Sequence, residues 1–95
     1  MPVQVMVQHR AADYEAWKSV FDEHEKVRRA HGATGHRLYQ TVDDPNSIVI
    51  ITQFATQDGA QGFLTDPSLR EAMSKAGVQG TPTITVCQEQ EDVSY

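Results

Sequence analysis

The order in which two hydrophobic periodicities follow one another restricts the fold of this chain more than any other feature. Val3, Val5 and Val7 alternate with other residues, which is the spacing of a strand with one buried face. Between residues 14 and 30, apolar residues recur instead every three or four positions, which predicts a helix. In chain order, the predicted elements are strand 2–8, helix 14–30, strand 36–41, strand 47–54, helix 57–64, helix 67–76 and strand 81–89.

Turn-forming residues separate these elements. The segment Asp44–Asn46 suits a tight turn, because its proline presets φ and its asparagine tolerates the next position, so the flanking strands are expected to form a hairpin. Pro67 breaks the second helical region in two, since the residue before a proline avoids the α conformation. The order βαββαβ is typical of an α+β ferredoxin-like domain with a four-stranded antiparallel sheet. We expect one such domain at residues 1–90 and an acidic C-terminal tail at 91–95.

The charge balance excludes several classes of partner. The 95 residues include 13 acidic and 8 basic ones, and the net charge of −5 argues against binding to nucleic acid or to an anionic membrane. No apolar run is long enough for a transmembrane helix, and we expect no signal segment at the start of the sequence. The single cysteine, Cys87, cannot form an internal disulfide, and we therefore expect a cytoplasmic protein.

The alternation of side chains along the strands predicts one face covered by helices and a second face that is too apolar for a bare surface. The covered face is expected to carry Val3, Val5, Val7, Leu38, Ile48, Ile50, Ile84 and Val86. The second face is expected to carry Met6, Arg37, Tyr39, Val49, Ile51 and Cys87. Exposed apolar patches of this kind usually mark an interface, so we expect a homodimer through the second face. A half-apolar face open to water is the alternative.

Several segments resemble a known group of proteins. They are Asp13-Tyr14-x-x-Trp17-Lys18-x-x-Phe21-Asp22-x-His24, Gly32 to Tyr39, Asp43 to Asn46, Phe63-Leu64 and Met73-x-x-Ala76-Gly77-Val78. Together they resemble the dimeric α/β-barrel superfamily, which includes antibiotic-biosynthesis monooxygenase-like proteins, polyketide cyclases and stress-responsive barrel proteins. The resemblance implies two ferredoxin-like subunits whose sheets face each other, with a small-molecule pocket between the sheet and the helices of each subunit. Because this fold hosts oxygenases, isomerases, decarboxylases and proteins without known activity, it does not choose among them.

One face of the first predicted helix carries the candidate site. Trp17, Phe21, His24 and Arg28 follow one another at spacings of three and four and therefore share this face with Tyr14. An imidazole at His24 can act as a general base or acid near neutral pH, and Arg28 can hold a phenolate, enolate or carboxylate. The alternative is structural: the aromatic rings form core, His24 lies at the core edge, and Arg28 extends to water.

Residues outside this helix complete the candidate set. His9 follows Val7 on the helix-facing side of the first strand, where it either opens onto the same cavity or only ends the strand. We expect His31 and His36, which flank a glycine turn, to be exposed to solvent. The residues predicted to be catalytic are His24, His9 and Arg28. The residues predicted to bind the ligand are Trp17, Phe21, Tyr14 and Phe63.

Other kinds of chemistry find little support in the sequence. His24 and His31 lie about 10 Å apart along a helix, which is too far for one metal ion, so no metal site is expected. Cys87 has no positive neighbour in sequence that would lower its pKa and make it a nucleophile. Phosphate-loop and dinucleotide fingerprints are missing. Any activity is therefore expected to be cofactor-free, or to depend on something that the substrate or a diffusible ligand brings.

Two functional hypotheses remain. The cofactor-free oxygenases of the group that this chain resembles use a helix tryptophan, and the resemblance implies that Trp17 can take that role. The asparagine that these oxygenases carry near the start of the first strand has no counterpart here, because positions 4 and 8 are Gln4 and Gln8. Cyclisation or isomerisation of an enolisable substrate needs only a base and an oxyanion partner. We therefore predict a small-molecule enzyme of the cofactor-free monooxygenase-like or cyclase/isomerase-like type, with a small aromatic or enolisable ligand. The alternative is a non-catalytic barrel dimer that binds a ligand or has a stress-related role. A pocket of a few hundred Å³ beside His24 favours the enzyme, and a filled core rejects it.

Overall fold

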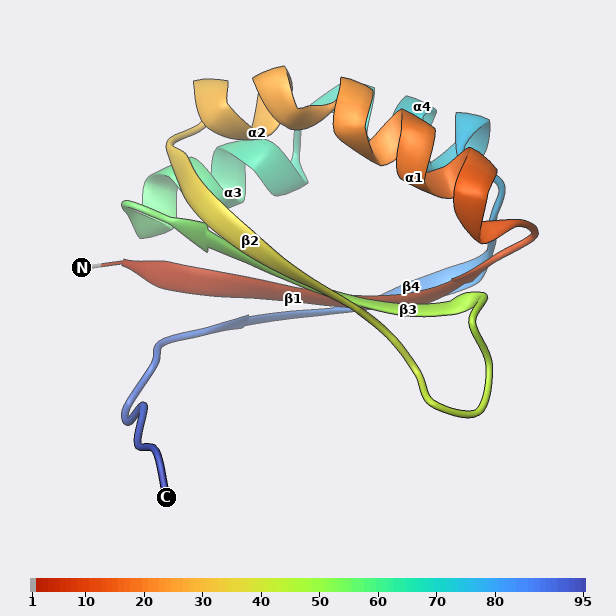
Figure 1. Cartoon of the computed structure of the whole chain (residues 1–95). Coiled ribbons are helices and arrows are strands. Elements are labelled where there is room, and N and C mark those ends of the chain that lie inside the picture. The colour runs from red at the N-terminus through yellow and green to blue at the C-terminus, as the bar shows by residue number, and fades with distance from the viewer. Residues whose placement is uncertain (1) are drawn as a thin grey trace.

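Four segments with alternating side chains pair into one antiparallel sheet, as the computed structural model of residues 2–95 shows (Figure 1). The strands are β1 (Val3–Ala11), β2 (Ala33–Gln40), β3 (Ser47–Phe54) and β4 (Val78–Cys87). Their order in the sheet is β2-β3-β1-β4, so β1 and β3 are the central strands. The predicted α+β ferredoxin-like fold with a four-stranded antiparallel sheet is confirmed.

All the helices cover the same face of this sheet (Figure 1). They are α1 (Tyr14–Glu23), α2 (Glu25–Ala30), α3 (Gln57–Leu64) and α4 (Pro67–Lys75). A side-chain oxygen of Asp13, Thr56 or Asp66 accepts a backbone N–H at the start of α1, α3 and α4 respectively, which satisfies a donor that the helix itself leaves free. The predicted division of the second helical region is confirmed, with Pro67 in the first turn of α4.

The first helical region is not the single helix expected over residues 14–30. α1 ends at Glu23 and α2 begins at Glu25, with His24 between them. The cause is a contact made by Arg28, whose Nη1 donates a hydrogen bond of 2.9 Å to the carbonyl oxygen of Phe21. In an uninterrupted helix that oxygen would accept from the N–H of Glu25. A side chain that inserts into the ladder in this way is a recognised cause of helix bends.

Two strands begin earlier than predicted. β2 starts at Ala33 rather than at residue 36, and β4 spans residues 78–87 rather than 81–89. Each strand follows directly on a glycine in the left-handed region, Gly32 at φ 90° and Gly77 at φ 79°. Because such a glycine closes the preceding helix and turns the chain sharply, the strand can begin at the next residue.

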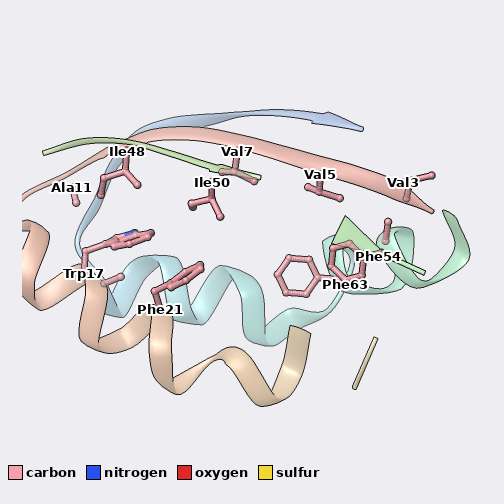
Figure 2. Close-up of a cluster of buried hydrophobic side chains, with 12 residues drawn as sticks. Val3, Val5, Val7, Ala11, Trp17, Phe21, Ile48, Ile50, Phe54 and Phe63 are labelled. Carbon is pink, nitrogen blue, oxygen red and sulfur yellow. The ribbon is translucent and has the colours of Figure 1, made fainter. Parts of the chain in front are cut away.

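The core lies between the sheet and the helices (Figure 2). Val3, Val5 and Val7 of β1 and Ile48 and Ile50 of β3 point from the sheet toward the helix layer. The helices contribute three buried aromatic anchors and several half-buried side chains around them. The buried anchors are Trp17, Phe21 and Phe63. The prediction that the valines and isoleucines of the central strands face the helices is therefore confirmed.

The edge strand β4 is covered less well than expected. Ile84 pairs with Val7 and Val86 pairs with Val5, so both lie on the helix-facing side as predicted. Their exposed fractions are nevertheless 42 % and 37 %, because the helices do not extend fully over this edge. No helix within residues 2–95 is long and apolar enough to cross a membrane.

The second face of the sheet carries no helix (Figure 1). The strand register places Met6, Ile51 and Arg37 in one row, and Val49 and Tyr39 in the next. Met6 and Tyr39 are 38 % and 47 % exposed, while Val49 and Ile51 are half-buried by their neighbours. Cys87 lies on this face as well, exposed and opposite Gln4. The predicted composition of this outer face is thus confirmed.

Candidate functional site

A cavity of about 60 Å³ lies between the inner face of the sheet and the helices. β1 and β3 form its floor, and residues from all four helices form its walls. Six predicted site residues line it: His9, Trp17, Phe21, His24, Arg28 and Phe63. Tyr14 stacks on Trp17, with ring centroids 6.0 Å apart, but does not line the cavity. The fold therefore brings together every predicted site residue except Tyr14.

The cavity is smaller than the few hundred Å³ that the enzyme hypothesis predicts. Because one water molecule needs about 10–15 Å³ of such space, it has room for a few waters. A second depression of about 220 Å³ lies on the surface between α1 and α4. It shares Val20, His24 and Ala72 with the cavity. His24 therefore lies between the internal cavity and the outer depression.

Arg28 is a buried cation that forms no ion pair with a carboxylate of the described residues. Its side chain is not extended to water, because only 4 % of the residue is exposed. The guanidinium lies over the ring of Phe21, 3.8 Å from its centroid, and Nη1 donates to the Phe21 carbonyl, but Nη2 has no hydrogen-bond partner among residues 2–95. Burial lowers the pKa of Arg28, against the opposing charges of Glu25 and Asp22, yet a guanidinium stays protonated near neutral pH. The expectation that Arg28 extends to water is therefore wrong, and its free donor is available to an anion in the cavity.

His9 is a second buried polar group at the cavity. It is 7 % exposed, and in the described part of the chain neither Nδ1 nor Nε2 has a hydrogen-bond partner. Its ring meets Trp17 edge to face, with centroids 5.6 Å apart. Because burial lowers the pKa of His9, the imidazole is neutral at pH 7 and offers one donor and one acceptor. Of the two alternatives for His9, the geometry agrees with a residue that opens onto the cavity.

His24 connects the helix break to the start of α4. Its Nε2 lies 3.0 Å from Oγ of Ser68, and its ring lies 5.8 Å from that of Phe63. The pKa of His24 is lowered first by burial and then by the charge of Arg28, whereas the charge of Asp66 raises it. His24 is thus neutral near pH 7 and is able to accept a proton.

His31 is not the solvent-exposed residue that was expected. Its Nε2 donates a hydrogen bond of 2.8 Å to Oδ2 of Asp66, and both side chains are only about a quarter exposed. The bond from His31 and those from Ser68 lower the pKa of Asp66 to about 2, so the carboxylate is ionised and acts only as an acceptor. His36 is exposed as predicted, with its ring edge-on to Phe21 at 5.0 Å.

The contribution of α4 to the site was not predicted from the sequence. Asp66 and Ser68 read as a helix start, and no local pattern shows that they reach histidines of the first helical region. Leu69 and Met73 also line the cavity, and their spacing of four residues is the one signal that marks them as one helix face. Within residues 2–95, no group of three or more histidine, cysteine, aspartate or glutamate side chains is arranged to hold a metal ion.

The fold and the cavity define a ferredoxin-like α+β protein with a small internal site between its sheet and its helices. The sequence profile of the antibiotic biosynthesis monooxygenase family matches residues 2–75, which is most of the chain. The chain belongs to this family. A comparison with curated proteins finds no match.

Solved structures agree with this assignment at the level of the fold. The chain is similar to SnoaB, a cofactor-independent oxygenase from Streptomyces nogalater, with a TM-score of 0.81 and 16 % identity over 99 % of this chain and 98 % of that one. It is also similar to Rv0793 from Mycobacterium tuberculosis, with a TM-score of 0.71 and 17 % identity over 99 % of this chain and 100 % of that one. A structure described as an antibiotic biosynthesis monooxygenase gives a TM-score of 0.72 and 14 % identity, over 94 % of this chain and 99 % of that one.

Proposed function

We propose that this protein is a small-molecule enzyme of the cofactor-free monooxygenase-like or cyclase/isomerase-like type, acting on an aromatic or enolisable substrate in the cavity. The observation that carries the proposal is the Nη2 of Arg28, a charged donor that is buried in the cavity wall without a partner. Keeping an unpaired cation in a small core costs several kcal/mol unless something else binds it. An anionic oxygen of a substrate is the partner that fits a guanidinium.

The step common to both reaction types is removal of a proton from the substrate. Neutral His24 or His9 takes the proton from an acidic C–H or O–H group, and the electron pair left behind moves onto oxygen as an enolate or phenolate. Arg28 stabilises that oxygen with a charge-assisted hydrogen bond in a site with little water. The anion then cyclises or isomerises, or reacts with dioxygen in the monooxygenase-like case. Trp17, Phe21 and Phe63 supply flat apolar walls for the rest of the substrate.

Substrate binding requires the cavity to enlarge, and α4 is the wall that is best able to move. None of its residues is fully buried, whereas α1 contributes both Trp17 and Phe21 to the core. Between α1 and α4, the cavity and the outer depression are separated by Val20, His24 and Ala72. We infer that a substrate reaches Arg28 through this gap, with a small outward displacement of α4.

A solvent-exchange experiment tests the proposed function. Aromatic 1,3-dicarbonyl compounds are incubated with the protein in deuterated water, and loss of the acidic carbon-bound protons is followed by NMR. The wild type and an Arg29→Met control are expected to accelerate exchange, because Arg29 is exposed and only pairs loosely with Glu25. His24→Ala and Arg28→Met are expected to lose most of the acceleration. Equal exchange by Arg28→Met and the wild type would contradict the proposal.

The small volume of the cavity favours the second candidate, a non-catalytic barrel protein that binds a ligand. The same experiment separates the two. A compound that binds and perturbs the NMR signals of His9 and Trp17, yet whose protons exchange no faster than in buffer, identifies a ligand-binding protein. Faster exchange that depends on Arg28 identifies the enzyme.

We further propose that two copies pair through the outer face of the sheet, in a reducing compartment such as the cytoplasm. The face is uncovered and combines Met6, Ile51, Val49 and Tyr39, and it also bears the free thiol of Cys87. Burial of such a patch is worth several kcal/mol at about 25 cal/mol per Å². Light scattering at micromolar concentration is expected to give twice the chain mass of 10.6 kDa, and a mass near 10.6 kDa would contradict pairing.

A further inference from the structure

The start of α4 meets the first helical region in a group of four polar residues: His24, Ser68, Asp66 and His31. Nε2 of His24 lies 3.0 Å from Oγ of Ser68, the backbone N–H of Ser68 donates to Oδ1 of Asp66 at 2.9 Å, and Nε2 of His31 donates to Oδ2 of Asp66 at 2.8 Å. The group extends from the edge of the cavity toward the junction of α3 and α4. Helix capping explains only the bond between Asp66 and the Ser68 N–H.

The ionised carboxylate of Asp66 decides the direction of the bond between Ser68 and His24. The Ser68 hydroxyl has one hydrogen, and it has two neighbouring acceptors, the charged carboxylate and the neutral imidazole. A charged acceptor forms the stronger hydrogen bond. From this preference we infer that the Ser68 hydroxyl donates to Asp66, whose pKa it helps to lower, and that its oxygen accepts from Nε2–H of His24.

We propose that Ser68 and Asp66 are positioning residues for His24: they hold its proton on Nε2 and leave Nδ1 as the nitrogen that accepts the substrate proton. The role as a base rests on the proposed function, whereas the hydrogen-bond arrangement does not. When His24 takes up a proton, the imidazolium is bound through Ser68 to the negative charge of Asp66. This arrangement restores basicity that burial and Arg28 remove.

Other charges around His24 do not supply this pairing. The outer depression beside His24 is also lined by the charged residues Glu23, Lys26, Glu71 and Lys75. Glu23 is paired with Lys75 at 3.2 Å, and both side chains are more than half exposed, so water screens their charges. His31 already donates to Asp66 and therefore shares the same carboxylate. Asp66 is the carboxylate next to the Ser68 that contacts His24, and its charge raises the pKa of His24.

NMR titration of the histidine side chains in the full-length protein tests the proposal, with His24→Gln used to assign the signals. In the wild type, the ¹⁵N shifts of His24 are expected to show a protonated Nε2 and an unprotonated Nδ1. Ser68→Ala is expected to lower the pKa of His24 by about half to one unit, because a bond to the charged imidazolium is lost. Ser68→Thr should restore the wild-type pKa, and Ser74→Ala, an exposed serine on the same helix, should leave it unchanged.

Two outcomes would overturn the proposal. A proton on Nδ1 in the wild type, with a rise of the His24 pKa in Ser68→Ala, would show that Ser68 donates to His24 instead. An unchanged pKa in Ser68→Ala would show that the contact carries no coupling. Asp66→Asn keeps a good helix cap and should lower the His24 pKa as well, with a much smaller effect when Ser68 is already alanine.

The solvent-exchange assay separates this proposal from the proposed function. If His24 is a base, the pH profile of exchange shifts by the same amount as its NMR pKa in Ser68→Ala. If the NMR shifts agree with the proposal but His24→Ala accelerates the exchange of substrate protons as much as the wild type, then Ser68 and Asp66 position His24 as proposed. In that case His24 is not the base of the reaction.

Discussion

Replacement of His9 by leucine is expected to stabilise the folded protein rather than weaken it. His9 lies on the inner face of the central strand β1, opposite Ile48 and against the edge of Trp17. A chain selected for stability alone would place an apolar side chain there. Both ring nitrogens lack a hydrogen-bond partner within residues 2–95, so burial of these polar atoms destabilises the folded protein.

The size of the effect follows from the groups that are removed. Each buried donor or acceptor without a partner costs about 1–3 kcal/mol, and His9 has one of each when neutral. Loss of the edge contact with Trp17 costs about 0.5–1.5 kcal/mol. With the low end of the first range, His9→Leu should raise the free energy of unfolding by about 1 kcal/mol, or about 4–8 °C in Tm for a domain of this size.

The pH dependence of stability gives an independent readout. Burial lowers the pKa of His9 in the folded state, so below about pH 6.5 the unfolded chain binds a proton that the folded chain does not. The free energy of unfolding therefore falls with decreasing pH, by up to about 1.4 kcal/mol per unit for this residue, until the lowered pKa is passed. His24 and His36 also have lowered pKa values, but they are present in every variant and cancel in the comparison.

The appropriate assay is chemical denaturation at fixed protein concentration. The free energy of unfolding is measured at pH 7.5 and at about three pH values below 6.5. His9→Asn serves as the control, because it keeps a buried donor and acceptor but cannot titrate. It should not be stabilised, yet should share the flatter pH dependence of His9→Leu. A destabilised His9→Leu protein, or one whose pH dependence equals that of the wild type, would refute the reasoning.

Two further predictions concern packing and assembly. Gly59→Ala should lower the free energy of unfolding by about 1–3 kcal/mol, because a Cβ at Gly59 collides with the backbone carbonyl of His31. The collision outweighs the better helix propensity of alanine. Thermal melts should detect this loss and should show little change for the control Gly35→Ala, where the space around the Cβ is open. Ile51→Asp places a charge in the outer face of the sheet and should therefore halve the mass measured by light scattering. Ser19→Asp, on an exposed helix surface, should leave the mass at the wild-type value. An unchanged mass for both variants would argue against pairing through this face.

The sequence was sufficient for those parts of the fold that depend on local periodicity. The alternation in β1 and β3 and the turn at Asp44–Asn46 set which residues face the helices, because these signals act between near neighbours. The break at His24 was invisible, since residues 14–30 contain neither glycine nor proline and the cause is the bond from Arg28 to the Phe21 carbonyl. The exposure of Ile84 likewise depends on how far the helices extend over β4, which no spacing in the sequence reveals.

The candidate site was predictable only in part for the same reason. The stripe from Trp17 to Arg28 identified one wall of the cavity, because helical spacing places these side chains on one face. Ser68 contacts that stripe at His24, although the two residues are 44 positions apart in the chain. The volume of the cavity was also out of reach, since it depends on how the rings of Trp17 and Phe21 stack, with centroids 4.9 Å apart.

An optical titration with 4-nitrophenol tests most directly whether the cavity binds an anion at Arg28, since only the ionised phenol absorbs strongly in the visible range. The wild type and the Arg29→Met control are expected to bind the phenolate and to lower the apparent pKa of the probe by about 1–2 units, the equivalent of one charge-assisted hydrogen bond. Arg28→Met is expected to abolish that shift. A shift of the same size in Arg28→Met, or no saturable change with the wild type, would contradict the account.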